Sequence, residues 1–177
     1  ATMACAMEAS GRAGIPFVVL DRPNPIGGER VEGNIVEAEW RSFVGAWPLP
    51  VRHGLTIGEL ARLFVDSFGV RCDLTVVPME GWSRGMSWDA TALPWVAPSP
   101  NMPSPETASV YPGACLVEGT NLSEGRGTTR PFEWIGAPWL DPEAFAARLA
   151  AFELPGVAWR PMRFTPSFHK HAGRSCG

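Results

Sequence analysis

Pro16-Phe-Val-Val-Leu-Asp21 is a short apolar run that ends in an acidic residue, a pattern typical of a buried strand in a parallel sheet. Residues 1–13 before it predict a helix that ends at Gly14. A helix, a tight turn and a strand in succession favour an α/β layered sheet. Residues 22–28, Arg-Pro-Asn-Pro-Ile-Gly-Gly, then follow the carboxyl end of the strand, where open α/β sheets usually bind ligands.

A second helix and a second strand are predicted further along the chain. Thr56-Ile-Gly-Glu59 has the pattern of a capping box, and the helix that it opens should end at Gly69. Four apolar residues would share one face of this helix: Ile57, Leu60, Phe64 and Phe68. Leu74-Thr-Val-Val-Pro78 then predicts the second strand of the sheet.

The remaining elements are fewer and separated by long loops. Asp141-Pro-Glu143 predicts a helix start, with Asp as the cap and Pro in the first turn. Alternating residues at 157–164 predict a further strand. Residues 29–55 and 79–105 are expected to be irregular. Three aromatic residues should pack against the first of these loops: Trp40, Phe43 and Trp47. Three apolar residues should form the buried face of the last helix: Phe145, Leu149 and Phe152.

Composition excludes several classes of protein. Among 177 residues, 45% are hydrophobic and 19% charged, which indicates a globular chain long enough to bury a core. A net charge of −3 gives no electrostatic footprint for nucleic acid, and no apolar run is long enough to cross a bilayer. The 18 prolines and 19 glycines indicate long ordered loops. Four widely spaced cysteines argue against a zinc site and leave disulfide pairing open.

The segment 111–133 is rich in the residues that active sites use. Its 23 positions hold three glutamates, two arginines and four glycines. Glycines allow the backbone to approach a ligand closely, arginines bind carboxylates and phosphates, and glutamates transfer protons or attack carbon. We therefore interpret this segment as the floor of an active site.

Glu118 and Glu124 are the candidate catalytic pair. Glu118 follows the apolar residues 114–117, which favour a neutral acid, whereas Glu124 is close in sequence to Arg126 and Arg130, which favour a carboxylate. Glycoside hydrolysis uses two carboxyl groups with such opposite tendencies. The alternative is that Glu124 forms an ordinary ion pair and Glu118 is a buried cap.

Other residues are candidates for binding. Arg126 and Arg130, helped by the amides of glycines, could bind an anionic group, or they could simply brace the loop. A nucleotide-binding P-loop fits poorly because the Gly-Lys-Ser/Thr ending is absent. His53 could reach a ligand or be structural, and Trp95 could stack on a sugar or be core. His169 and His171 are too isolated to predict a metal site.

Several strings resemble those of the bacterial exo-β-N-acetylmuramidase family, formerly a domain of unknown function. The resemblance runs in order along nearly the whole chain. It is carried by residues 20–25 (LDRPNP), 52–61 (RHGLTIGELA), 93–96 (LPWV), 99–103 (SPNMP) and 111–133.

The resemblance implies removal of terminal β-linked N-acetylmuramic acid from the non-reducing ends of peptidoglycan fragments. It also implies a partial Rossmann-like layered sheet with helices at 1–105, followed by the start of a smaller α+β domain at 106–177, with the active site in a cleft between them. Because neither end looks like a natural terminus, we expect an internal piece of a longer protein. A Gly-Pro-Glu-His-Gly type motif of the family, a source of a further carboxylate, is absent from the 177 residues.

The resulting hypothesis is a glycosidase in which Glu118 donates a proton and Glu124 acts as base or charge stabiliser. No cofactor or metal is expected. The alternative is a non-catalytic module that binds cell-wall sugars or anions. A peptidoglycan substrate favours the periplasm or the cell exterior, with cytoplasmic recovery of imported fragments as the other option. The candidate substrate-binding residues are Arg22, Asn24, His53, Trp95, Asn101, Asn121, Arg126, Thr128 and Arg130.

Overall fold

The computed structural model describes all residues from 1 to 177 as two compact units. Unit 1 comprises Ala1–Pro94 and unit 2 comprises Trp95–Gly177. The boundary between residues 105 and 106 that the sequence suggested stays a prediction. None of the helices combines the length and apolar character needed to span a membrane.

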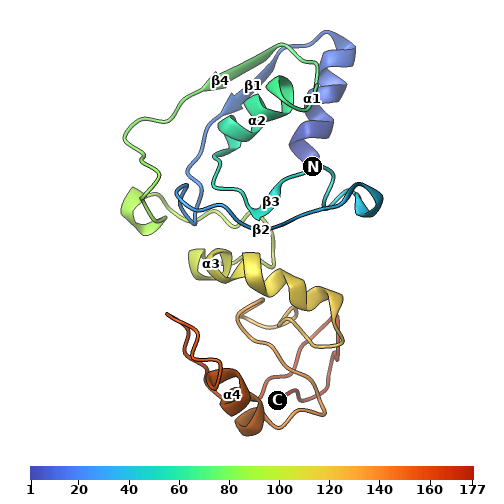
Figure 1. Cartoon of the computed structure of the whole chain (residues 1–177), viewed down its shortest axis with the longest axis vertical. Helices are drawn as coiled ribbons and strands as arrows, with labels where there is room; N and C mark the ends of the chain where they lie inside the picture. The colour runs from blue at the N-terminus through green and yellow to red at the C-terminus, as the bar shows by residue number, and fades with distance from the viewer. The chain divides into compact units, whose positions relative to one another are not determined.

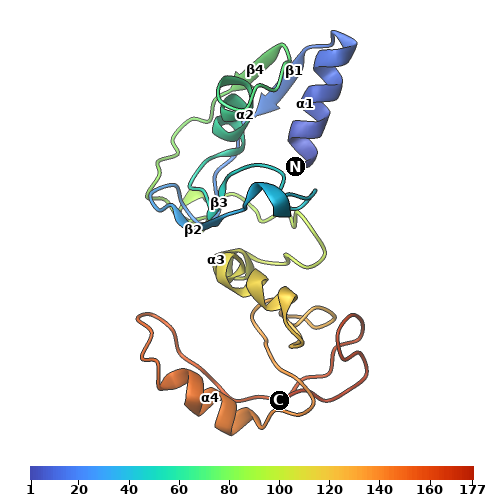
Figure 2. The same cartoon turned by 45° about the vertical axis from the view of Figure 1, so that its right-hand side comes forward.

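Unit 1 contains the α/β layer predicted from the sequence (Figures 1 and 2). Its sheet pairs β1 (Phe17–Leu20) with β4 (Leu74–Val77) in parallel, with Phe17 opposite Leu74. The helices are α1 (Thr2–Ala13) and α2 (Ile57–Asp66), and α2 contacts both strands. Gly14 ends α1 in a left-handed conformation with φ 65°, as its position predicted. The α/β fold class is confirmed.

The core of unit 1 lies on one face of this sheet. Met7 of α1, Val19 of β1 and Phe64 of α2 are buried together. Val18 and Leu20, which point to the opposite face, are 57% and 67% exposed. The expectation of a strand buried on both faces was therefore wrong, because within this unit both helices pack on the Val19 side only.

The start of α2 is fixed by a set of polar contacts. Thr56 accepts from the amide of Glu59, and the Glu59 side chain accepts from the amide of Thr56, so the predicted capping box is present. Asp21, directly after β1, accepts from the Thr56 hydroxyl at 2.9 Å and from the Gly58 amide at 2.7 Å. A Cβ at Gly58 would lie 2.7 Å from the Asp21 carboxyl carbon, so only glycine allows this approach. These hydrogen bonds thus fix the end of β1 against the start of α2.

Residues 29–55 are more regular than expected. They contain β2 (Glu32–Ile35) and β3 (Pro50–Arg52), which pair antiparallel, and the short 3₁₀ helix η1 (Ala38–Trp40). Trp47 packs on the rings of Phe64 and Phe68, as predicted. Trp40 and Phe43 are 71% and 64% exposed, so their predicted packing role was wrong. Strands this short, one of them with Gly33 and Asn34, carry little periodic signal.

The loop after β4 holds only one short element, the 3₁₀ helix η2 (Asp89–Thr91). Unit 2 contains α3 (Pro105–Ala114), the 3₁₀ helix η3 (Cys115–Gly119) and α4 (Pro142–Ala150). No helix was predicted at the position of α3, although Ser104 caps the helix and Pro105 occupies its first turn. Pro112 lies inside the helix, where proline is unfavourable, and so argues against a helix at this place.

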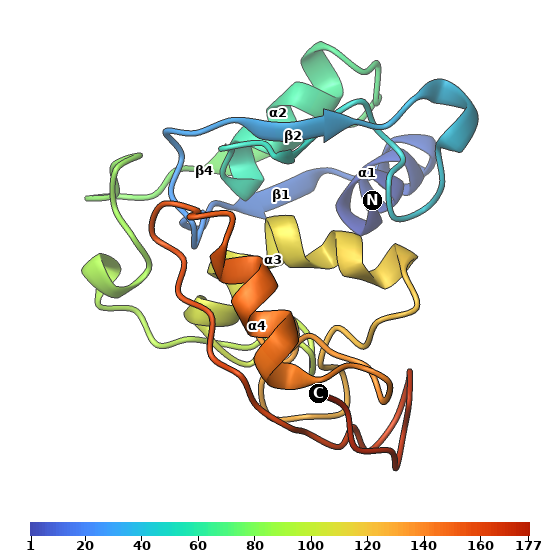
Figure 3. The ribbon, with the colours of Figure 1, turned by 60° about the horizontal axis from the view of Figure 1, so that its bottom comes forward.

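The helix α4 starts where the sequence predicted it, whereas the strand predicted after it is absent. Asp141 accepts from the Ala144 amide at 2.8 Å and caps the helix. Phe152 is 72% exposed, so it does not complete the apolar face of α4. Residues 157–164 form no strand, and only an isolated bridge joins Phe164 to Cys176. Figure 3 shows this segment as an extended trace after α4. All four cysteines are free thiols.

Candidate active site

Arg126 is the centre of the charged cluster in unit 2. Its Nε lies 2.9 Å from Oε1 of Glu118, and its Nη2 also donates to that oxygen. The same Nε lies 3.2 Å from Oε1 of Glu124. One guanidinium therefore contacts both candidate catalytic carboxylates. The Arg126 guanidinium also lies 5.1 Å from the centre of the Phe132 ring, within cation–π range.

The two carboxylates differ in access to solvent. The Glu118 side chain is 36% exposed, whereas that of Glu124 is completely buried. Glu118 is thus neither in apolar surroundings nor without a charged partner, contrary to the expectation from residues 114–117. Three basic side chains surround Glu124: Arg126, the imidazole of His169 at 2.9 Å and Lys170 at 3.3 Å. These contacts are close in distance, but none has the alignment of a hydrogen bond, so charge rather than directional bonding holds Glu124.

The C-terminal segment of unit 2 runs along this loop. The Ser167 amide donates to the Gly127 carbonyl at 2.8 Å, and the Ser167 hydroxyl donates to the same oxygen. Gly127 has φ 82°, and a Cβ there would lie 2.7 Å from the Phe168 amide nitrogen. Glycine at this position is required for the close approach that brings His169 and Lys170 to Glu124.

Arg130 and Thr128 do not join the cluster around Arg126. Arg130 pairs with Glu133 at 3.2 Å, and Thr107 of α3 donates to the other Glu133 oxygen at 2.7 Å. The sequence proximity of Arg130 to Glu124 was therefore misleading. The Thr128 hydroxyl donates to the Gly125 carbonyl at 2.6 Å and closes a local turn. These residues brace the loop, which was the alternative interpretation of Arg130.

Two aromatic residues pack in a row beside the Arg126 guanidinium. The ring of Tyr111 in α3 contacts that of Phe132 edge-to-face, with 4.8 Å between the ring centres, and the Phe132 ring contacts the Arg126 guanidinium. Phe132 is 2% exposed and adopts φ 65°, an unusual conformation for a bulky residue. Burial raises the pKa of Tyr111, so its hydroxyl stays neutral at physiological pH.

Three further candidate residues lie in unit 2 outside the cluster around Arg126. The Trp95 indole donates to the Met102 carbonyl at 3.1 Å. The Asn101 amide nitrogen of the backbone donates to the Ser99 hydroxyl. Asn121 is exposed, and its carbonyl lies 2.8 Å from Nε2 of His171. Their predicted roles in substrate binding stay predictions.

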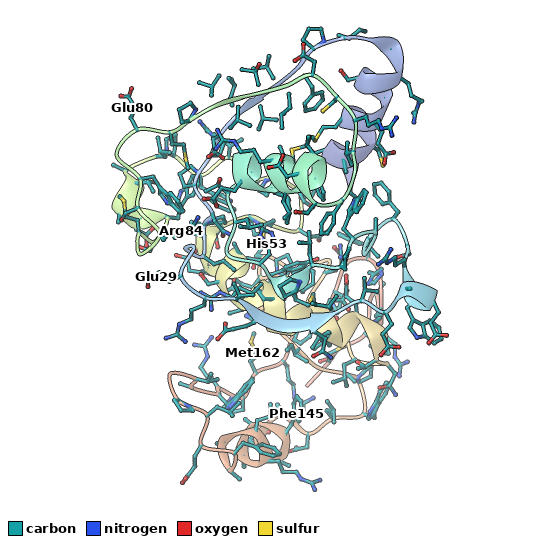
Figure 4. The ribbon with its side chains drawn as sticks, turned by 45° about the horizontal axis from the view of Figure 1, so that its top comes forward. Glu29, His53, Glu80, Arg84, Phe145 and Met162 are labelled. Carbon is teal, nitrogen blue, oxygen red and sulfur yellow. The ribbon has the colours of Figure 1, made fainter.

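The candidate residues of unit 1 line a common hollow of about 220 Å³ beside the start of α2. Arg22, Asn24 and His53 all contribute to its wall. Asn24 donates to the Leu55 carbonyl, and Nδ1 of His53 accepts from the Leu55 amide, so both side chains also shape the loop. Burial lowers the pKa of His53, which favours the neutral ring that accepts this bond. Figure 4 shows His53 and Arg84 on the loops next to α2.

The sequence did not reveal that His169 and Lys170 belong to the site. They lie more than 40 positions after Glu124, and His-Lys-His had no partner at metal-ligand spacing. One signal was available, because Lys170 is the only lysine among the 15 lysine and arginine residues.

Comparisons with known proteins agree on one family. The model of the N-terminal domain of exo-β-N-acetylmuramidase NamZ matches residues 1–106, and the model of the C-terminal domain matches residues 109–177. A Bacillus subtilis (strain 168) protein named peptidoglycan β-N-acetylmuramidase NamZ is 57% identical over 175 residues, which cover 99% of this chain and 42% of that protein.

Solved structures give the same result. Two DUF1343 family proteins of Bacteroides fragilis NCTC 9343 match 99% of this chain, with TM-scores of 0.91 and 0.76 and identities of 40% and 30%. The match covers 46% of each of those chains, so this chain spans less than half the length of the relatives. The resemblance noted in the sequence is confirmed, and the chain belongs to the exo-β-N-acetylmuramidase NamZ family.

Proposed function

We propose that this chain carries part of the active site of a glycosidase that releases terminal β-linked N-acetylmuramic acid from the non-reducing ends of peptidoglycan fragments. Membership of the NamZ family and 57% identity to a protein of that name support this activity. At the level of residues, the proposal rests on one observation. Arg126 contacts both Glu118 and Glu124 and so places them in one cluster.

Glu118 is our candidate for the proton donor because its side chain is accessible. It would protonate the leaving glycosidic oxygen as the bond from that oxygen to the anomeric carbon breaks, and water would supply the new hydroxyl. Arg126 donates to Glu118 in this structure, and the lactyl carboxylate of N-acetylmuramic acid offers Arg126 a replacement partner that would free Glu118.

Glu124 fits the second of the two roles considered for it. A completely buried carboxylate surrounded by Arg126, His169 and Lys170 has no access to a sugar or to an attacking water. It can stabilise positive charge and orient Arg126, which supports the role of charge stabiliser over that of base. A residue other than Glu124 therefore activates the water in this proposal.

The test compares Glu118→Gln with Glu143→Gln in the purified full-length protein. Glu143 is an exposed glutamate in the first turn of α4, so its variant controls for loss of one carboxylate. We expect Glu118→Gln to lower kcat for release of N-acetylmuramic acid by about 100- to 10,000-fold, the usual contribution of general acid catalysis, and Glu143→Gln to have no effect. Normal turnover by Glu118→Gln would contradict the assignment.

The same assay separates hydrolysis from binding. Saturable binding of muramyl saccharides without any release by the wild-type protein would favour the sugar-binding module instead. The proposed substrate also favours a location in the periplasm or outside the cell. Fractionation that recovers the native protein only with the cytoplasm would contradict this part of the proposal.

A further inference from the structure

The Lys170 ammonium lies inside a ring of oxygen atoms. It donates to the carbonyl oxygens of Glu118, Thr120 and Leu122 at 2.9, 2.9 and 3.1 Å, and the Val117 carbonyl lies at 3.3 Å. Oε2 of the buried Glu124 lies at 3.3 Å as a fifth neighbour. An ammonium group has three protons, so five oxygens surround it as they would surround a bound monovalent cation.

The loop that supplies these oxygens needs a positive charge at this place. Four carbonyls from residues 117–122 turn their negative ends toward one point, next to a carboxylate with no exposed surface. Without a cation, these groups would repel one another and Glu124 would lose the charge of the Lys170 ammonium. The carbonyls of Val117 and Glu118 are at one end of the loop and Glu124 is at the other. The ammonium therefore links the backbone that carries Glu118 to the Glu124 carboxylate.

The backbone around Lys170 is shaped for this contact. In an extended strand, consecutive side chains point to opposite faces. Here His169 contacts Glu124, Lys170 enters the ring and His171 contacts the Asn121 carbonyl, so three consecutive side chains reach the same loop. His169 and His171 have φ values of 70° and 58°, in the left-handed region. Such conformations persist where the surrounding contacts hold them in place.

The residue type also matters. Of the 15 lysine and arginine residues of the chain, 14 are arginines, and Lys170 is the only lysine. An ammonium is a compact point charge that can bind oxygens from several directions, whereas a guanidinium is a planar fork. Arginine would therefore keep the charge but not fit the ring.

We propose that Lys170 is the positioning residue of the Glu118–Arg126–Glu124 cluster and acts as a tethered cation in an oxygen-lined site. When the side chain is removed, this site accepts a free alkylammonium ion. The inference deepens the proposed function and rests on it only for the catalytic consequence. The cation site itself is independent of any activity.

The experiment is chemical rescue of Lys170→Ala in the full-length protein. Propylammonium supplies the atoms that this variant lacks, and tetramethylammonium, which has no N–H group, is the control ion. Hydrogen exchange of the amides of residues 118–126 is followed with and without each ion. Exchange should be faster in Lys170→Ala and return toward the wild-type rate with propylammonium only. Wild-type exchange in the variant, or acceleration that propylammonium does not reverse, would overturn the proposal.

Kinetics provide the second readout. We expect kcat for muramic acid release to fall about 100-fold in Lys170→Ala, as displaced catalytic groups commonly cause, with KM changed less. Lys170→Arg should also be impaired, and wild-type kinetics in this charge-conserving variant would contradict the tethered-cation role. Arg174→Ala, on the same segment, is the matched control and should behave as wild type. If the wild-type protein releases no muramic acid, the proposed function fails, while the exchange experiment still judges Lys170.

Discussion

The hollow in unit 1 and the charged cluster in unit 2 are built in different ways. In unit 1, Asn24 and His53 form neutral hydrogen bonds with the backbone of Leu55, and Thr56 caps the helix that follows it. In unit 2, Glu118 and Glu124 are held by Arg126 and Lys170, which are partners of opposite charge. The neutral hydrogen bonds of unit 1 fix the shape of the hollow. The ion pairs of unit 2 can exchange partners with a charged substrate. The second arrangement is therefore the better candidate for chemistry.

Arg126→Lys should have the largest effect on this contrast. Lysine keeps the charge but lacks the fork that reaches both carboxylates, so we expect kcat/KM to fall about 100-fold or more, as when one preorganised donor is lost. Steady-state kinetics on muramyl saccharides would measure the loss. Arg148→Lys, at the end of α4, is the matched control. Equal kinetics for the two variants would show that the shared guanidinium is not needed.

Thr56→Ala should weaken unit 1 without removing a charged side chain. The hydroxyl accepts from the Glu59 amide and donates to Asp21, and its loss should lower the free energy of unfolding by about 1–2 kcal/mol. Urea denaturation would measure this change. Thr75→Ala, at an exposed position of β4, should change stability much less. Equal stability of Thr56→Ala and Thr75→Ala would show that the Thr56 hydroxyl does not stabilise unit 1.

His53 should give the smallest effect, visible as a dependence of stability on pH. Burial lowers the pKa of His53 below its usual value of 6.5, so the unfolded chain binds the proton more readily. The contribution of His53 to stability is present above pH 6.5 and is lost as the pH falls through the folded-state pKa. The melting temperature of His53→Ala, measured from about pH 8 to about pH 5, should therefore fall less than that of the wild type. A steeper fall in the variant would contradict the neutral role of this ring.

Local signals explain which parts of the structure could be predicted. The capping box of α2 and the Asp141 cap of α4 involve residues three positions apart, so the sequence displays them directly. The contacts of Glu124 with His169 and Lys170 join residues more than 40 positions apart, and nothing in the local sequence encodes them. Arg130 shows the opposite error, because closeness in sequence suggested Glu124 and the structure pairs it with Glu133. The sequence therefore predicted which loop holds the candidate site, whereas the contacts of its charged residues became clear only in the folded structure.

A double-mutant cycle of Glu118 and Arg126 tests the central claim most directly. If both residues act as one unit, Glu118→Gln combined with Arg126→Ala should reduce muramic acid release about as much as the more damaging single variant alone. If the two losses in kcat/KM simply multiply, the residues act independently and the account of a shared catalytic cluster is wrong.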